Sequence, residues 1–329
     1  MASNSLEPVD HEPITLQINV APSDHWHIRA SLEHHLRIWG PQVDEILFSI
    51  DTLRSPGRRG AEWDEGRPRL AAVLTDIRTH HPNIRAIDVE YGAEQSALVS
   101  REFFGGASIP KKDCFGAPFY AYLHGLHAAS NRFVLHLDAD MLFGGGHASW
   151  GKEAIAAMQA RPDVLFCGPL PGPPTADGKI AASIARRHHT TQRYGSLPIP
   201  QQFPTLAYGF THMSTRVFLL DRQRFASHVG ALKPMRLLRP TYPRGLGHPP
   251  FYPLETVFSR AMRRHKLIRL NMLGKAPGMW YVHPPARSSE LERELPRLIE
   301  RVERGNVPPE QFGDDQMNVS MYEEAAAAE

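Results

Sequence analysis

The sequence predicts an α/β protein of a single domain, in which a mostly parallel central sheet is flanked by helices. Between residues 14 and 137, apolar runs of strand length alternate with segments of helical periodicity. Such a β-α-β order is typical of a parallel sheet covered by helices. Acidic residues follow two of the apolar runs directly, at Asp51 and Asp138. Because ligands of open α/β sheets bind at the carboxyl ends of strands, the pattern also indicates where a site would lie.

Four apolar runs of this first half are predicted to be strands, at 14–20, 43–51, 83–91 and 133–137. Apolar residues at helical spacing mark two connecting helices: Ile28, Leu32, Leu36 and Trp39 in one, and Leu70, Val73, Leu74 and Ile77 in the other. The first helix is expected to begin at a cap formed by Ser23 or Asp24. The second follows a basic, glycine-rich loop over 54–69. A further helix over 116–130 carries small residues at every fourth position, so it can lie close to the sheet.

The second half of the chain is less regular. Strands are predicted at 163–170, 214–221 and 267–272, helices at 254–266 and 290–305, and a core-closing segment at 280–285. Prolines, glycines and aromatic residues over 234–253 predict a long functional loop.

The predicted domain covers 13–287, with a nucleotide-binding half of about 13–145 and an acceptor half of about 146–287. A disordered lead is expected at 1–12, and a charged helix with a polar tail at 288–329.

The bulk composition limits the classes of function. Of the 329 residues, 42% are hydrophobic and 22% are charged, which is ordinary for a globular protein with a core. The formal net charge of +2 is too small to predict attraction to nucleic acid or to a membrane surface. Neither cysteine, Cys114 or Cys167, has metal-ligand spacing. The sequence shows no secretory signal and no apolar run of transmembrane length, so a soluble, cytoplasmic protein is expected.

The stretch FVLHLDADMLF, from Phe133 to Phe143, carries the strongest chemical signal. Two carboxylates, Asp138 and Asp140, stand at the end of an apolar strand, where burying like charges without a partner is unfavourable. A divalent cation would remove this penalty. Mg²⁺ and Mn²⁺ prefer oxygen ligands and keep positions open for the oxygens of a diphosphate. The motif is short, and a turn with two solvated aspartates explains it equally well on its own.

A phosphatase of the haloacid-dehalogenase type also begins with an apolar strand and D-x-D. That pattern requires Thr or Val two residues after the second Asp, where this chain has Leu142. It also usually opens its domain, whereas three β-α units precede the motif here. The phosphatase hypothesis therefore ranks below the next one.

Four elements in order, over roughly residues 14–285, resemble the GT-A-fold glycosyltransferases, and among them the family-2 group. The DAD motif resembles the family's DxD. The helix over 116–130 resembles its G-x-S-x-A-R-N-x-G-L-x-x-A, although Tyr122 replaces the family's Arg. YGFTHMSTRVFLLDRQRF resembles the glycine loop before a strand and helix. LETVFSRAMRRHKLIRL resembles the acidic helix start, with Thr256 in place of a second acid.

The resemblance implies roles in donor binding. Val20 and Ala21, at the end of the first strand, would contact the nucleotide base or ribose, and Gly209 in the glycine loop would help to bind the donor. Asp51 would accept a hydrogen bond from uracil or a related base, although a turn or helix cap explains this residue equally well.

The resemblance also implies metal and catalytic roles. His283 would complete a Mn²⁺ or Mg²⁺ shell with Asp138 and Asp140, since a neutral imidazole can bind Mn²⁺. Most of the 18 histidines must nevertheless be surface or packing residues. Glu255 would take the acceptor proton in an inverting mechanism. Alternatively it caps its own helix, and Thr256 leaves a retaining mechanism open.

The predicted activity is the transfer of a sugar from a nucleotide-diphosphate donor, with UDP-sugars first, to an acceptor hydroxyl or amine. Basic residues could approach the diphosphate, at Arg54, Arg58 and Arg59 and at Arg186, Arg187, His188 and His189. Solvated faces explain such runs as well. Aromatic residues could form an acceptor wall: Tyr242, Phe251 and Tyr252.

Two other classes stay open. A nucleotidyltransferase uses a similar sheet, but it would show a Gly- and Arg/Lys-rich phosphate signature after the first strand, where this chain has VAPSDHWHIR. A non-catalytic sugar-nucleotide-binding relative is possible because Thr256 replaces an acid; donor turnover would separate it from an enzyme.

Overall fold

The computed structural model describes residues 12–60, 62–181, 184, 190–194, 205–237, 247–284 and 288–322. Several sequence predictions fall on residues outside these ranges: the lead before Glu12, the basic cluster at 186–189, Tyr242 and the end of the tail.

The first half forms the parallel sheet that the sequence predicts. Its strands are β1 (Ile14–Val20), β2 (Glu45–Ile50), β3 (Ile84–Asp88) and β4 (Phe133–Asp138). They lie in the order β3-β2-β1-β4, and each pair is parallel. The carboxyl ends of β1, β2 and β4 therefore meet at one edge, which brings Val20, Asp51 and Asp138 to the same side of the molecule.

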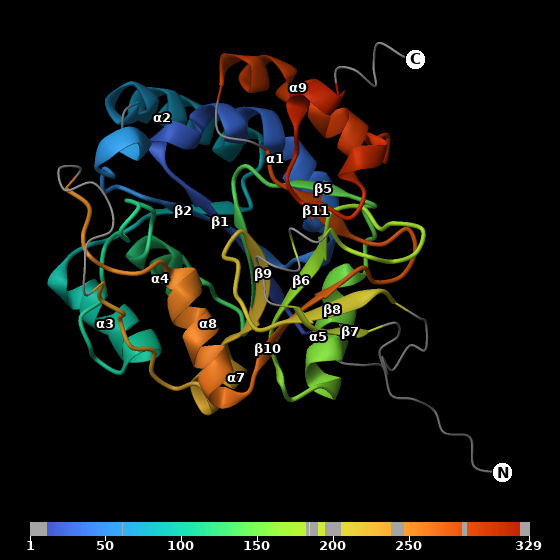
Figure 1. Cartoon of the computed structure of the whole chain (residues 1–329). Coiled ribbons are helices and arrows are strands. Elements are labelled where there is room, and N and C mark those ends of the chain that lie inside the picture. Colours follow the sequence, from blue (N-terminus) through green and yellow to red (C-terminus); the bar gives the residue numbers. More distant parts are fainter. Residues whose placement is uncertain are drawn as a thin grey trace.

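Helices cover both faces of this sheet. They are α1 (His25–Trp39), α2 (Trp63–His80), α3 (Ala93–Phe104) and α4 (Tyr120–Ala128). Figure 1 shows α1 and α2 on one face and α3 and α4 on the other. The core divides in the same way, since apolar residues of β1 pack with α1 and α2, whereas α3 and α4 belong to a second cluster. Short 3₁₀ turns lie at Pro22–Asp24, Gly40–Gln42, Gly57–Gly60 and Pro309–Gln311.

The small-residue face of α4 lets this helix approach β1 closely. A Cβ added at Gly125 would lie 2.5 Å from Nε2 of Gln17. Beneath the helix, Nε2 of Gln17 donates to Oδ1 of Asn19 at 3.0 Å, and the side-chain oxygen of Gln17 contacts the His136 ring. The small residues therefore make room for a buried polar group that is satisfied within the sheet.

The second half continues the sheet through long-range pairs. Its strands are β5 (Leu142–Gly144), β6 (Val164–Pro171), β7 (Thr190–Tyr194), β8 (Ala207–Phe210), β9 (Val217–Asp221), β10 (Ile268–Met272) and β11 (Trp280–Val282). The order continues β4-β9-β6-β10-β8-β7, and β11 pairs with β5 and β6. Among the described strands, only β9, β8 and β5 run against the others. The prediction of a mostly parallel α/β sheet is confirmed.

The remaining helices are α5 (Trp150–Ala160), α7 (Arg222–His228), α8 (Leu254–His265) and α9 (Ser289–Glu303). One face of α9 is buried, through Leu291, Leu295, Leu298 and Val302, in a cluster that includes Leu142 of β5. Each such side chain stabilises the fold by about 1.5–3 kcal/mol. No helix in the described part of the chain is both long and apolar enough to cross a membrane.

Three local predictions were wrong. Helix α2 begins at Trp63, inside the stretch predicted to be a loop, because Trp63 is buried and Asp64 and Glu65 suit a first turn. Asp24 does not cap α1 through its side chain; the carboxylate turns back to accept the Ala21 N–H at 2.7 Å. Gly209 lies within β8 rather than in a loop, because β8 pairs with β10.

Candidate active site

The DAD motif lies where β4 ends, as predicted. Asp138 is the last residue of β4, and its N–H donates to the Arg216 carbonyl at 2.8 Å. The Ser31 hydroxyl of α1 donates to the Ala139 carbonyl at 3.0 Å. The side chains of Asp138 and Asp140 keep 26% and 32% of their surface exposed. The backbone of the motif is therefore fixed from two sides, while both carboxylates can reach a ligand.

Tyr122 of α4 orients the first carboxylate. Its hydroxyl donates to Oδ1 of Asp138 at 2.9 Å, and the buried His136 ring lies 3.7 Å from the same oxygen. Tyr122 occupies the position where the resembled family has an arginine. In this chain the tyrosine at that position binds Asp138 of the DAD motif.

The second carboxylate meets His283, as the resemblance implied. Nε2 of His283 lies 3.4 Å from Oδ2 of Asp140. Burial opposes ionisation of Asp140, but attraction to His283, His27 and Arg216 outweighs it and lowers the pKa of this carboxyl. The charged form that a metal ion needs is thus favoured.

The same pair leaves polar atoms unused. Oδ1 of Asp140 and Nδ1 of His283 are buried and have no hydrogen-bond partner among the described residues. Oxygen and imidazole nitrogen suit Mn²⁺, so these residues fit a divalent ion. No group of three histidine, cysteine or acidic side chains in the described ranges forms a ready metal cluster. Such an ion would therefore take its other ligands from water and substrate phosphates, as Mg²⁺ commonly does.

The segment near the C-terminus holds His283 in place. The His283 N–H donates to the Asp315 carbonyl at 2.7 Å, and the His283 carbonyl accepts the Met317 N–H at 3.0 Å. The Asp315 side chain is buried and lies 3.7 Å from the Arg216 guanidinium. The sequence analysis gave no role to Asp315 or Arg216, because their pairing joins distant segments and has no local signature.

Glu255 lies in the first turn of α8, and its carboxylate binds Thr215. Its Oε1 accepts the Thr215 N–H at 2.8 Å and lies 3.3 Å from the Thr215 hydroxyl. Thr215 directly precedes Arg216, so two consecutive residues connect Glu255 to Asp138. The alternative that Glu255 caps its own helix was wrong, because the carboxylate bonds to a different element.

Burial raises the pKa of Glu255. The Thr215 N–H and the charges of Arg216 and Arg269 oppose this rise, and repulsion from Asp138 adds to it. A raised pKa brings a carboxylate closer to the range in which a general base works well.

Asp51 is more enclosed than the sequence suggested, with 2% of its surface exposed. It accepts the Tyr91 hydroxyl at 2.6 Å, the Lys112 ammonium at 2.5 Å and the Leu53 N–H at 3.0 Å. That Asp51 accepts a hydrogen bond from a nucleobase stays a prediction. In this structure a base would compete with these three partners for the carboxylate.

Of the other residues predicted to bind the sugar donor, Val20 and Ala21 lie beside Asp51, whereas Gly209 lies apart from it. The Val20 carbonyl accepts the Asp51 N–H at 2.8 Å, so the ends of β1 and β2 are tied together. Ala21 is partly exposed beside them. Gly209 pairs with Leu270 across the sheet, on the far side of β9 and β6 from β4.

Asp24 is an acid of the site region that the sequence signalled only as a cap. Burial raises the pKa of Asp24 to about 7. The Ala21 N–H opposes this rise, and repulsion from Asp140 and Asp138 adds to it.

The basic and aromatic candidates are only partly described. Arg54 donates to the Gly60 carbonyl at 3.1 Å and to Asp64 at 2.7 Å, so its guanidinium is engaged on the protein. Phe251 and Tyr252 are half-buried and hydrogen-bonded through their backbones to Cys114 and Met235. The side chains of Arg58 and Arg59 lie outside the described part.

Comparison with known proteins gives matches among solved structures. No protein-family model matches the sequence, and no curated protein matches it. The galactosyltransferase LgtC is 12% identical, with a TM-score of 0.33 over 65% of this chain and 60% of that chain. GalNAc-T7, solved with UDP, GalNAc and Mn²⁺, is 12% identical, with a TM-score of 0.44 over 84% of this chain and 44% of that chain.

Glucosyl-3-phosphoglycerate synthase from Mycobacterium tuberculosis, solved with Mn²⁺, UDP and phosphoglyceric acid, is 9% identical. Its TM-score is 0.36, and the match covers 88% of this chain and 77% of that chain. The chain spans about three fifths of the length of LgtC and less than half of GalNAc-T7. With TM-scores below 0.5, these matches assign no function to this chain.

Proposed function

We propose that this protein is a metal-dependent glycosyltransferase that moves a sugar from a nucleotide-diphosphate donor to an acceptor hydroxyl or amine. One observation carries the proposal. At the end of β4, Nε2 of His283 lies 3.4 Å from Oδ2 of Asp140, and Asp140 and His283 each have a buried polar atom without a partner in the described residues.

Asp140 and His283 would hold the divalent ion, with Asp138 assisting. When bound, Mn²⁺ or Mg²⁺ neutralises the charge that builds up on the leaving diphosphate. The protein prepares this site through its own contacts. Tyr122 fixes the rotamer of Asp138, and the backbone of Asp315 fixes His283.

Glu255 would act as general base. Its ionised carboxylate takes the proton of the acceptor hydroxyl, the acceptor oxygen bonds to the anomeric carbon, and the bond from that carbon to the diphosphate oxygen breaks. Attack from the side opposite the leaving group inverts the anomeric configuration. The Thr215 N–H binds Oε1 of this carboxylate, and Oε2 would accept the proton of the acceptor.

The donor is proposed to be a UDP-sugar, bound along the edge formed by Val20, Ala21 and Asp51, with Gly209 as a more distant candidate. The test is turnover. UDP-sugars with Mn²⁺ are offered to the protein alone and with a panel of alcohols and amines, and released UDP is measured. Release that requires Mn²⁺ supports the proposal, and the product's anomeric configuration, read by NMR, decides between inversion and retention. Tight UDP-sugar binding without any release would contradict an enzyme and favour a binding protein.

A further inference from the structure

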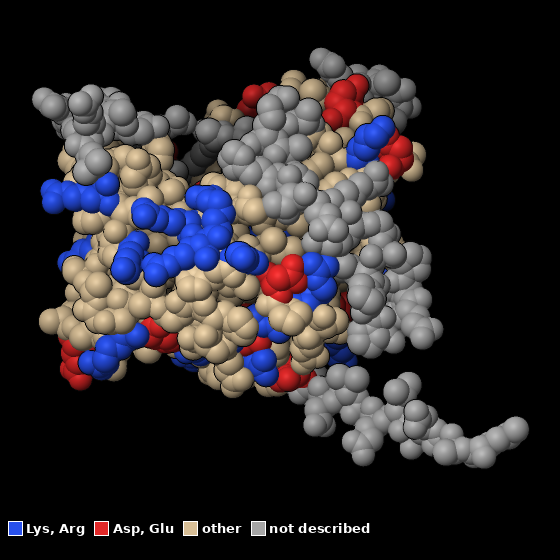
Figure 2. Space-filling model, turned by 60° about the horizontal axis from the view of Figure 1, so that its bottom comes forward, with Lys and Arg blue, Asp and Glu red and all other residues tan. Residues whose placement is uncertain are grey.

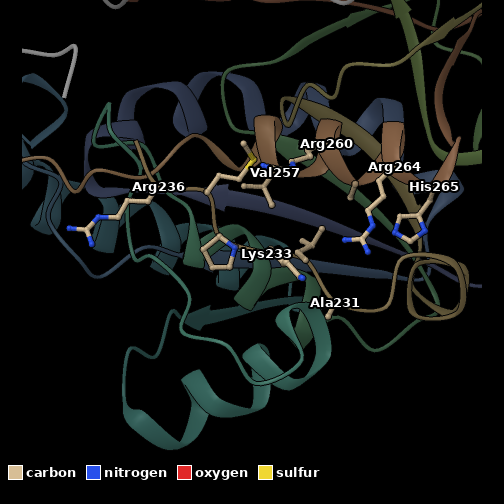
Figure 3. Close-up of a pocket in the computed structure, with 11 residues that line it drawn as sticks. Ala231, Lys233, Arg236, Val257, Arg260, Arg264 and His265 are labelled. Carbon is tan, nitrogen blue, oxygen red and sulfur yellow. The ribbon is translucent and has the colours of Figure 1, made fainter. Parts of the chain in front are cut away.

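A cavity of about 390 Å³ lies on the outer side of α8, away from the candidate active site. One wall is the face of α8 that carries Val257, Arg260 and Arg264, and the other is the segment 231–236. Figure 3 shows these side chains around the opening. On an α-helix, five residues correspond to a rotation of roughly 140°. Arg260 therefore points to a different side of α8 from Glu255.

The cavity is strongly basic. Its lining includes Lys233, Arg236, Arg260, Arg264 and His265, and none of the described residues that line it is acidic. The four lysine and arginine side chains are exposed, and none of them forms an ion pair with another described residue. Figure 2 shows Lys and Arg side chains gathered on this side of the molecule, with few Asp and Glu among them. A net charge of only +2 for the whole chain means that this positive charge is local.

The floor of the cavity is apolar. Leu232 and Val257 are buried there, and Met235 and Ala261 are partly buried beside them. Guanidinium groups bind phosphate oxygens through paired, charge-assisted hydrogen bonds. The volume lies in the range of pockets that bind small organic molecules. A cationic rim over an apolar floor therefore fits a phosphate ester, with the phosphate at the rim and the carbon skeleton on the floor.

One wall of the cavity is also tied to the approach to Glu255. The Tyr252 N–H donates to the Met235 carbonyl at 2.9 Å, and the Leu237 N–H donates to the Pro250 carbonyl at 2.9 Å. A ligand against Met235 and Arg236 would therefore rest on a segment that is hydrogen-bonded to Pro250 and Tyr252, shortly before α8.

We propose that this cavity is a second binding site, for a phosphate ester, separate from the proposed donor site and independent of the proposed function. The phosphate ester can be a free metabolite or the headgroup of an anionic phospholipid, since both present the same group.

The test uses the full chain in EDTA, with the Asp140→Asn substitution as a background that disables the proposed metal site. The soluble probe is glycerol 3-phosphate, followed by calorimetry. The lipid probe is vesicles of phosphatidylglycerol compared with phosphatidylcholine, followed by flotation. The pocket variant Arg260→Gln/Arg264→Gln is compared with Arg263→Gln/Lys152→Gln, which removes the same charge outside the cavity and is a folding control.

We expect the background protein to bind at least one probe, and the pocket variant to bind it about tenfold or more weakly. The control variant should stay within about twofold. Binding of glycerol 3-phosphate identifies a free ester as the ligand, and binding of phosphatidylglycerol vesicles alone identifies a headgroup. Binding of neither probe, or equal weakening in both variants, would overturn the proposal. Because the metal site is disabled throughout, these outcomes do not depend on glycosyl transfer.

Discussion

The two halves of this molecule build the candidate site in different ways. In the first half, β1, β2 and β4 are parallel neighbours, so their carboxyl ends share one edge and bring Asp138 to it. In the second half, the site residues arrive through pairs between distant segments. His283 follows β11, which pairs with β5, and its backbone is held by Asp315. The first half thus supplies Asp138 and Asp140, with Tyr122 to orient Asp138, and the second half supplies His283, Arg216 and Glu255.

The largest expected effect tests the contribution of the second half to the chemistry. Glu255→Gln keeps the shape and the hydrogen bond to Thr215 but removes the base, so kcat should fall about 10²–10⁴-fold while the Kd of the donor is unchanged. Because burial raises the pKa of Glu255, wild-type kcat should decline with falling pH at a value above the ordinary glutamate range. Turnover within a few-fold of wild type would remove Glu255 from this role.

A second prediction tests whether Asp51, at the carboxyl end of β2, serves mainly as the partner of the buried Lys112. Asp51→Ala leaves the buried Lys112 without its partner, and the free energy of unfolding should fall by about 3–5 kcal/mol. Glu62→Ala, at a nearby exposed acid, should change it by less than about 1 kcal/mol. Urea unfolding measures both. If Asp51→Ala is nearly neutral, the buried pair is not the main role of Asp51, and a comparison of UDP, CDP and GDP binding becomes the more informative test.

A third prediction concerns the segment around Asp315, which holds His283 through backbone hydrogen bonds. Asp315→Asn keeps the backbone bond to His283 but removes the buried charge that anchors this segment to Arg216. Mn²⁺ affinity should therefore weaken about 10–100-fold, as for other groups that orient metal ligands. Asp314→Asn changes the neighbouring acid and should leave the affinity within about twofold. Calorimetric titration of Mn²⁺ in the presence of UDP compares them. Equal Mn²⁺ affinities in the wild type and in both variants would show that the Asp315 side chain does not help to hold His283.

The smallest expected effects concern the pH dependence of stability. Two residues near or within α1, Asp24 and His35, contribute to it with opposite signs. Burial lowers the pKa of His35 to about 3, so the unfolded chain binds its proton more readily and stability falls between about pH 6.5 and pH 3. Burial raises the pKa of Asp24 to about 7, so the folded state binds that proton and stability falls as pH rises from about 4 to 7.

Each of these two contributions amounts to about 2 kcal/mol between pH 5 and pH 7.5. In EDTA, His35→Gln should therefore make stability fall with rising pH, and Asp24→Asn should make it rise. Urea unfolding at the two pH values measures both slopes, with the exposed His80→Gln as the reference. Unchanged slopes in either variant would contradict the burial of that group.

The contrast between the halves also explains what the sequence could predict. The strand 14–20 matches β1, and the DAD motif lies at the strand end as expected, because period and breakers are local signals. The strands β5, β7 and β8 were not predicted, because they form only by pairing with other segments of the chain. Arg216 and Asp315 escaped for the same reason. Asp51 was found as a strand-end acid, but its pairing with Lys112 across 61 residues has no signature in sequence.

The central claim is that Asp140 and His283 hold a divalent ion against a diphosphate. Calorimetry of UDP with Mn²⁺, and then with EDTA, tests it most directly in the wild type, in Asp140→Asn, in Asp138→Asn and in the control Asp76→Asn. We predict binding that requires Mn²⁺, a larger loss for Asp140→Asn than for Asp138→Asn, and none for the exposed Asp76→Asn. Equal UDP affinity in Mn²⁺ and in EDTA, with Asp140→Asn indistinguishable from wild type, would contradict the claim.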